Sequence, residues 1–176
     1  MSDLSEVLHL ETAKGAVILR PERVDDEALL YRLFHSWAYD DLALMQADEA
    51  TKENLVRFQF AGQTMTYRAR YPAARFDIIE QDGRPIGRLI DEPGSETEPA
   101  CLVDFVLLPE VRNGGLGRAI INAVLARYVR IGRKVRLKIL YHNEPSQRMC
   151  AALGFVEIDR DLPFIQMEWS PPPQGA

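Results

Sequence analysis

The spacing of hydrophobic and polar positions predicts short strands that alternate with helices. Apolar runs or alternations predict strands over 16–20, 75–81, 84–90, 101–108, 135–141, 155–159 and 164–169. Apolar residues at intervals of three and four predict helices over 22–34, 52–70, 116–131 and 144–153. Asp82-Gly83, between the second and third of these strands, is a strong hairpin signal. The predicted fold class is α/β, a central mixed sheet with helices on both faces.

The chain is expected to form a single domain between two less ordered ends. Residues 1–15 are polar and predict a flexible leader, 16–170 form the domain, and 171–176 predict a frayed tail. Residues 35–41 interrupt the helical pattern and mix aromatic with acidic side chains, as binding loops do. This segment offers candidate walls of a substrate site at Trp37, Tyr39 and Asp40. The alternative is that its aromatic residues only pack a connection.

Composition and charge narrow the functional classes. The chain has 176 residues, of which 47% are hydrophobic and 27% charged, enough for a core of its own. A net charge of -5 argues against a nucleic-acid binder held by backbone electrostatics. No apolar run approaches the length of a membrane span, so no membrane partner is expected. We also expect no signal peptide, because the N-terminus carries acids and no apolar run.

The cysteines and histidines indicate neither a disulfide framework nor a metal site. Cys101 and Cys150 both lie in apolar contexts, which predicts reduced, buried thiols and a cytoplasmic protein. The three histidines are scattered, and no Cys or His spacing matches a metal site. We therefore expect no metal cofactor.

The most informative stretch runs from 101 to 128 and predicts a strand, a glycine-rich turn and a helix. Residues 101–108 are apolar except for Asp104, and Pro109 ends the strand because it has no N–H to donate. The turn at 112–118 contains three glycines, which let a ligand approach the backbone closely. The helix after it begins with unpaired N–H groups and the positive end of its dipole. These features predict a phosphate or pyrophosphate site, the alternative being a turn made only for packing.

The residues of this turn exclude two common nucleotide-binding patterns and resemble a third. Gly117-Arg118-Ala119 is not the Gly-Lys-Ser/Thr of nucleotide hydrolases, and the third glycine of the dinucleotide fingerprint is missing. Arg112-x-x-Gly115-x-Gly117 instead resembles the pyrophosphate loop R/Q-x-x-G-x-G/A of the GNAT (GCN5-related) N-acetyltransferases.

A second segment carries the same resemblance. Asn143, Ser146, Met149-Cys150 and Gly154-Phe155 are similar to the N-x-x-A-x-x-L-Y-x-x-x-G-F motif of that family. The resemblance covers most of the chain, 16–169, and is closest to a bacterial branch. It implies the GNAT acyl-CoA N-acyltransferase fold, with acetyl-CoA as co-substrate. It also implies acetyl transfer to a primary amine of a small molecule or peptide, by direct attack.

The family pattern assigns a cofactor site residue by residue. The backbone at Phe105, Val106 and Leu107 is expected to pair with the pantetheine arm like an added strand. The pyrophosphate is expected at the loop residues Arg112, Asn113, Gly114, Gly115, Leu116, Gly117 and Arg118. Asn143 is expected to contact the arm. Its alternative role, compatible with the first, is to cap the following helix.

Catalytic candidates follow from the needs of acyl transfer, which are a deprotonated amine and a proton for the leaving thiolate. Asp104, an acid in an apolar strand, is the candidate base or amine-orienting group; alternatively it is a structural carboxylate bonded to a neighbouring backbone group or to an arginine. Cys150 stands where the family commonly has its acid tyrosine, and the alternative is a small core residue. Tyr141 offers a hydroxyl at a strand end, although its alternation with Ile139 favours a core position.

Two main functional readings remain open on this basis, and a third, a helix-groove interaction protein, requires that the helix over 52–70 expose its apolar face. The first is an acetyl-CoA-dependent N-acetyltransferase with an amine acceptor as its partner. The second is a non-catalytic acyl-CoA-binding or sensing module of the same fold. Cys150, and Lys138 where some family members place a base, keep the second reading open. A homodimer through the C-terminal strands is also possible.

Overall fold

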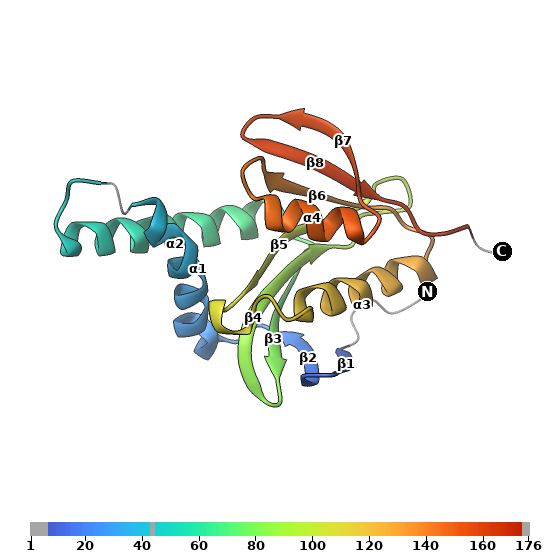
Figure 1. Ribbon diagram of the computed structural model, residues 1–176, viewed down its shortest axis with the longest axis horizontal. Helices are drawn as coiled ribbons and strands as arrows, with labels where there is room; N and C mark the ends of the chain where they lie inside the picture. Colours follow the sequence, from blue (N-terminus) through green and yellow to red (C-terminus); the bar gives the residue numbers. More distant parts are fainter. Residues whose placement is uncertain (1–6, 43–44, 174–176) are drawn as a thin grey trace.

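The computed structural model of the chain describes residues 7–42 and 45–173, with the backbone alone at 40 and 41. Within these residues an eight-stranded mixed sheet has the order β1-β2-β3-β4-β5-β6-β8-β7 (Figure 1). The strands are β1 Leu8–Thr12, β2 Gly15–Pro21, β3 Arg75–Gln81, β4 Arg84–Glu92, β5 Ala100–Leu107, β6 Val135–Leu140, β7 Val156–Asp161 and β8 Phe164–Trp169. The helices are α1 Glu27–Asp41, α2 Glu49–Arg70, α3 Leu116–Arg130 and α4 Glu144–Ala152, with 3-10 turns η1 Val24–Asp26 and η2 Pro109–Val111.

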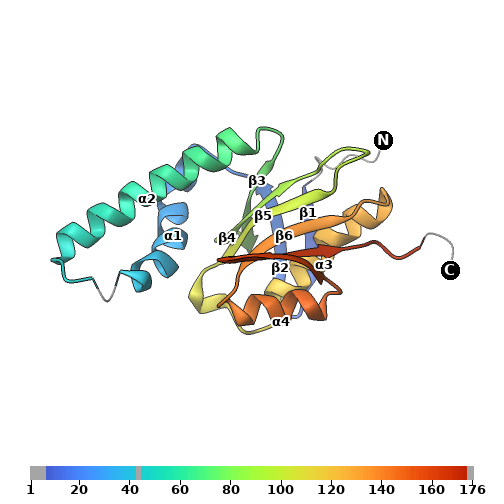
Figure 2. The same cartoon turned by 90° about the horizontal axis from the view of Figure 1, so that it is seen from above.

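The sheet separates the helices into two layers. Seen from above, α1 and α2 lie on one side of the sheet, and α3 and α4 lie on the other (Figure 2). The predicted α/β class, the β3–β4 hairpin and the parallel pairing of β5 with β6 across α3 are confirmed. None of the helices in the described residues has the length and apolar character that a membrane span requires.

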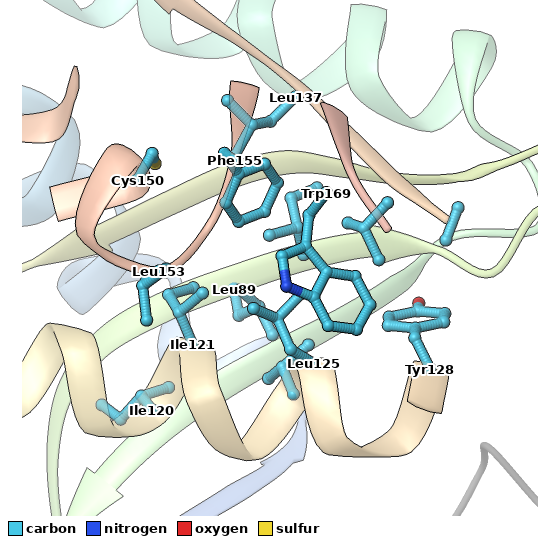
Figure 3. Packing of buried hydrophobic residues seen from close by; sticks show 14 of the residues in the cluster. Leu89, Ile120, Ile121, Leu125, Tyr128, Leu137, Cys150, Leu153, Phe155 and Trp169 are labelled. Carbon is cyan, nitrogen blue, oxygen red and sulfur yellow. The ribbon is translucent and has the colours of Figure 1, made fainter. Parts of the chain in front are cut away.

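The main core lies between the sheet and the α3–α4 layer. Ile121 and Leu125 of α3 pack with Leu89 of β4, Phe155 and Trp169 in one buried cluster (Figure 3). A smaller cluster joins α1 to α2 through Phe34, Ala38 and Val56. Because Val56 is the one buried residue of α2 within the described chain, that helix is held mainly by its partner α1.

Two predictions about the N-terminal part of the chain are wrong. Residues 8–12, assigned to a flexible leader, form β1, which pairs antiparallel with β2; Leu8 and Leu10 pack against the main core. Their alternation with polar residues is a strand signal that the polar composition obscured. Residues 35–41, predicted as a loop, continue α1. Phe34 and Ala38 lie one helical turn apart, and both are buried against α2. Residues 1–6 of the predicted leader and 174–176 of the predicted tail lie outside the described residues.

The sheet divides into two halves along β5 and β6. β5 pairs with β4 as far as Leu107, but it pairs with β6 only over residues 100–102. Beyond that point β6 remains paired with β8 on its other side, and β5 and β6 run apart (Figure 1). The prediction of a strand buried on both faces is therefore wrong for the second half of β5, where residues 103–106 are only half-buried.

Candidate active site

The separation of β5 from β6 leaves backbone edges that face each other without pairing. Residues 103–107 of β5 are bonded to β4 on one side, and the described chain places no strand on the other. A strand edge with free N–H and C=O groups binds an extended ligand by adding a strand to the sheet. Phe105, Val106 and Leu107, predicted to pair with a pantetheine arm, form this open edge.

A β-bulge in β5 decides which side chains face which layer. Ile90 of β4 lies opposite Asp104 and Asp91 lies opposite Leu102, so Val103 is an extra residue between them. Phe105 consequently points toward α3, where its ring lies near Gly117. Asp104 points to the other face, toward α2.

The loop after β5 presents its backbone to solvent at the start of α3. Asn113 and Gly115 have φ of 60° and 80°, the left-handed region, which Asn and Gly adopt most readily. Gly115 is the N-cap of α3, and an added Cβ there would meet no atom within 4 Å. The first N–H groups of the helix have no partner within it, and its first turn in the described structure carries no acid. This geometry fits an anion such as a pyrophosphate.

Gly117 and Arg112 support the loop from behind. A Cβ on Gly117 would lie 3.3 Å from the Phe105 ring and 3.6 Å from Met149 Sδ, so this glycine lets α3 approach β5 and α4. The Arg112 Nε donates to the Leu107 carbonyl at 2.8 Å, and a terminal nitrogen donates to Ser36 Oγ at 3.2 Å. Arg112 thus ties the loop to the end of β5 and to α1. Leu116 is buried, so it contributes its backbone only.

Asp104 is ion-paired and only partly exposed. Arg88 of β4 donates from two nitrogens to the same oxygen, Oδ2, at 2.6 and 2.9 Å. The Asp104 side chain is 21% exposed, whereas that of Arg88 is 7% exposed. The arginine-bonded alternative for Asp104 is therefore present in the structure, and the carboxylate is not an unpaired buried charge. Within the described residues no hydrogen bond reaches its other oxygen, Oδ1.

Helix α2 completes the polar cluster around this ion pair. Gln63 Oε1 accepts from Arg88 at 3.3 Å, and the Arg88 guanidinium lies 5.8 Å from the centre of the Tyr67 ring. Burial, followed by the nearby negative charge of Asp104, raises the pKa of Tyr67 to about 12. Tyr67 is thus a neutral hydroxyl beside the carboxylate. The cluster combines one acid, one buried cation and two neutral polar groups.

Asn143 lies at the matching end of β6 and caps α4. Its Oδ1 accepts from the Ser146 N–H at 3.2 Å, so the capping role is confirmed. Gln147, one turn into α4, donates to the carbonyls of Leu140 at 3.3 Å and Tyr141 at 2.8 Å. These bonds attach the end of β6 to α4.

Comparison with known proteins identifies the family. A family model described as "Acetyltransferase (GNAT) family" matches residues 32–155, which contain both β5 and the glycine loop. The chain belongs to the GNAT acetyltransferases. It is an acyltransferase, and acetyl-CoA is its co-substrate. A search of curated proteins finds no match.

Solved structures agree on the GNAT fold. PaiA N-acetyltransferase from Thermoplasma acidophilum, in complex with coenzyme A, has a TM-score of 0.63 and 18% identity, covering 88% of this chain and 98% of its own. An acetyltransferase from Thermus thermophilus has a TM-score of 0.64 and 24% identity, covering 93% and 99%. RimJ from Mycobacterium smegmatis, in complex with CoA-disulfide, has a TM-score of 0.65 and 19% identity, covering 95% and 88%.

The two proton-donor candidates of this GNAT protein have opposite surroundings. Cys150 of α4 is 4% exposed within the main core, which also contains Leu153, the residue after α4 (Figure 3). Cys150 thus occupies the core position given as its alternative, and burial raises the pKa of its thiol to about 11. Tyr141 was expected in the core, and this is wrong, because its side chain is 53% exposed. β6 ends at Leu140, so the alternation of the strand does not continue to Tyr141.

The candidate acceptor walls lie on α1 rather than on a loop. Tyr39 stacks on His35 with ring centres 4.6 Å apart and donates to Glu49 at the start of α2, which fixes the α1–α2 corner. Trp37 is 41% exposed and packs edge-on against Phe34. The side chain of Asp40 lies outside the described residues.

Arg88 and Gln147 are site residues that the sequence analysis missed. An arginine among the apolar residues of 84–90 was a usable signal, because a buried cation requires a partner. Gln147 had no such signal, since its role depends on where β6 ends.

Proposed function

We propose that the protein is an N-acetyltransferase that moves the acetyl group of acetyl-CoA to a primary amine of a small molecule or peptide. The observation that carries the proposal is the position of Asp104 beside the open edge of β5. Arg88 holds one carboxylate oxygen, and Oδ1 is left for a ligand at a partly exposed position. An ammonium group is the natural partner of such an oxygen.

In this proposal Asp104 orients the acceptor rather than acting as a strong base. Arg88 occupies Oδ2 alone, so Oδ1 is the oxygen that accepts a hydrogen bond from the ammonium and fixes its position. The ammonium loses a proton to water, and the lone pair of the resulting amine attacks the thioester carbonyl carbon. The C–S bond then breaks, the nitrogen gives up its extra proton to water to leave the amide, and the CoA thiolate departs and takes up a proton. Binding both substrates at one edge supplies much of the rate.

Tyr141 is the proposed source of that proton. It follows β6 directly, two residues before Asn143, and its ring is exposed at the end where β5 and β6 have separated. The family commonly has a tyrosine at the position of Cys150, and the buried thiol does not replace it. A neighbouring exposed hydroxyl is the better donor on these grounds.

The test measures turnover of acetyl-CoA with a panel of primary amines and peptide N-termini. The readout is the rate at which free CoA thiol is released. We expect transfer to a subset of the panel, and Asp104→Asn is expected to raise KM for the amine about tenfold or more, as lost charge-assisted hydrogen bonds do. Glu96→Gln, in the loop between β4 and β5, is the matched control and is expected to behave as wild type. An Asp104→Asn enzyme with unchanged kinetics would remove the acid from the mechanism.

A non-catalytic acyl-CoA-binding module is the second candidate. It is favoured by one observation, the inert, buried Cys150 at the position of the family acid. Saturable binding of acetyl-CoA with no turnover above hydrolysis, for every amine in the panel, would select this reading.

A cytoplasmic homodimer is proposed as the setting of this activity. Both cysteines are free thiols, as in a reducing compartment. β7 is an edge strand whose six residues are all exposed, including Val156 and Ile158. An unpaired edge strand offers its backbone to the same strand of a second copy. Val156 and Ile158 add apolar surface beside the four charged residues of this strand. Sedimentation of the protein across a range of concentrations tests the oligomeric state.

A further inference from the structure

The turn between β1 and β2 reaches the glycine loop of the cofactor site. β1 and β2 pair antiparallel from Leu8–Leu19 to Thr12–Gly15, which leaves residues 13 and 14 at the tip. The side chain of Lys14 extends from this tip to Gly114. A Cβ added to Gly114 would overlap the Lys14 Nζ atom, so the ammonium group lies directly on this glycine.

The backbone of Lys14 is held on both sides. Its N–H donates to Thr12 Oγ1 at 3.1 Å, and the same hydroxyl donates to the Gly15 carbonyl at 2.8 Å. Its carbonyl accepts from the Gln81 side chain, and the Ala16 N–H donates to Asp82 Oδ1 at 3.0 Å. The turn is therefore fixed to the β3–β4 hairpin. A fixed backbone reduces the conformational freedom that Lys14 loses when its ammonium binds a ligand.

The ammonium group of Lys14 has no acidic partner in the described structure. The ion pairs among those residues use other cations, such as Lys52 with Glu49 and Lys134 with Glu168. Gly114 is not among the glycines with positive φ, so backbone conformation does not demand a glycine there. The space that its missing side chain leaves is taken by the lysine.

We propose that Lys14 is a ligand of the phosphate groups of acetyl-CoA, supplied to the loop by the β1–β2 turn. The loop and the start of α3 offer backbone N–H groups and Arg118, and the first turn carries no acid. Lys14 adds a full positive charge beside them, at Gly114. The inference rests on acetyl-CoA being bound at this loop, and it assigns to the N-terminal hairpin a role in cofactor binding.

The first experiment is calorimetric titration of CoA and of dephospho-CoA, which lacks the 3′-phosphate, into wild type and Lys14→Gln. We expect Lys14→Gln to raise the Kd for CoA about five- to twentyfold. This lies between the loss typical of an exposed ion pair and that typical of a charge-assisted hydrogen bond. The same rise with dephospho-CoA assigns the pyrophosphate as the contact; a rise with CoA alone assigns the 3′-phosphate. Lys14→Arg is expected to restore most of the affinity.

Two further variants test whether the effect belongs to this contact. Lys134→Gln also removes one positive charge, but at a lysine that follows the C-terminal end of α3, far from the loop at its N-terminal end. This variant is expected to bind CoA as wild type does. Gly114→Ala displaces the Lys14 ammonium, so it is expected to weaken CoA binding. The double variant Lys14→Gln with Gly114→Ala is expected to bind CoA no more weakly than the weaker-binding single variant. Both changes remove the same interaction, so their effects do not add.

Two outcomes would overturn the inference. One is a Lys14→Gln protein with wild-type affinity for CoA, and the other is an equal loss in Lys134→Gln, which would mean that only net charge matters. Failure of the acetyl-CoA assignment itself is distinguishable, because then the folded wild type would bind neither CoA nor dephospho-CoA. Thermal melting of each variant confirms that it is folded.

Discussion

The two proton-donor candidates differ in burial, and only that of Tyr141 is the reverse of what its neighbours in sequence indicate. Cys150 sits in the main core with a pKa of about 11, and a thiol with that pKa and no access to solvent is a poor donor. Tyr141 is exposed where β6 ends, and its N–H donates to the Pro163 carbonyl at 2.9 Å. The backbone of Tyr141 is thus fixed by a hydrogen bond, while the residue as a whole stays largely exposed.

We expect Tyr141→Phe and Cys150→Ala to separate catalysis from stability. Removing the hydroxyl is expected to lower kcat about tenfold or more, as for loss of a general acid, without changing the melting temperature. Cys150→Ala is expected to keep kcat and to lower the free energy of unfolding by about 1 kcal/mol, because it leaves a small cavity. Steady-state kinetics and urea denaturation measure the two effects. A Cys150→Ala enzyme with low kcat and normal stability would restore the thiol as the acid.

At the scale of elements, a buried ion pair joins β2 to η1 and so sets where α1 begins. Arg20 of β2 donates to both oxygens of Asp26 at 2.7 and 2.8 Å, and the two side chains are 11% and 6% exposed. The Asp26 carboxylate also accepts from the Arg23 N–H at 2.7 Å. The hydrogen bonds from Arg20 hold the pKa of Asp26 below its usual value. The pair thus favours the ionised carboxylate in the folded state.

This linkage predicts how Asp26→Asn behaves with pH. A carboxylate whose pKa is lower in the folded state stabilises the protein above its unfolded pKa, about 4. The contribution is lost as the pH falls through the folded pKa. At pH 7 the variant is expected to be less stable by about 3 kcal/mol, because Arg20 keeps a buried, partly unpaired charge. Thermal melts at pH 7 and pH 3.5 test this, and a difference from wild type that does not shrink at the lower pH contradicts it.

At the scale of the whole molecule, two halves of the sheet are joined by a short contact. β1 to β5 form one half and β6, β8 and β7 the other, and residues 100–102 provide the strand pairing between them. α3 and α4 bridge the halves through the core. The free edge of β5 and the loop before α3 both lie where the two halves separate. A ligand that binds to both therefore adds hydrogen bonds in that region.

Acetyl-CoA is therefore expected to stabilise the folded protein markedly. At a hundredfold excess over Kd, linkage alone contributes about 2.7 kcal/mol. For a domain of this length that corresponds to a rise in Tm of roughly 5–10 °C. Gly115→Asp, which adds a negative charge where a Cβ meets open space, is expected to abolish the rise. Gly62→Asp, an equally open glycine on α2, is the control and is expected to keep it. Equal shifts in both variants would place the ligand elsewhere.

The order of strands and helices from β2 onward, and the glycine loop itself, were determined by the sequence alone. The apolar alternation of 75–81 and 84–90, the Asp82-Gly83 turn and the helical spacing after Gly117 each depend on residues close in the chain. Such local patterns set backbone conformation directly. The glycines of the loop and the helix that follows it are also close in the chain, so the loop motif alone predicts an anion site.

The partners of the functional side chains were decided only by the tertiary structure. Asp104 faces α2 and Arg88 because one extra residue, Val103, shifts the register of β5, and no local pattern encodes that bulge. Lys14 meets Gly114 because β1 joins the sheet on the side that α3 covers. Burial and pairing depend on which surfaces meet across the sheet, and residues far apart in the chain supply those surfaces.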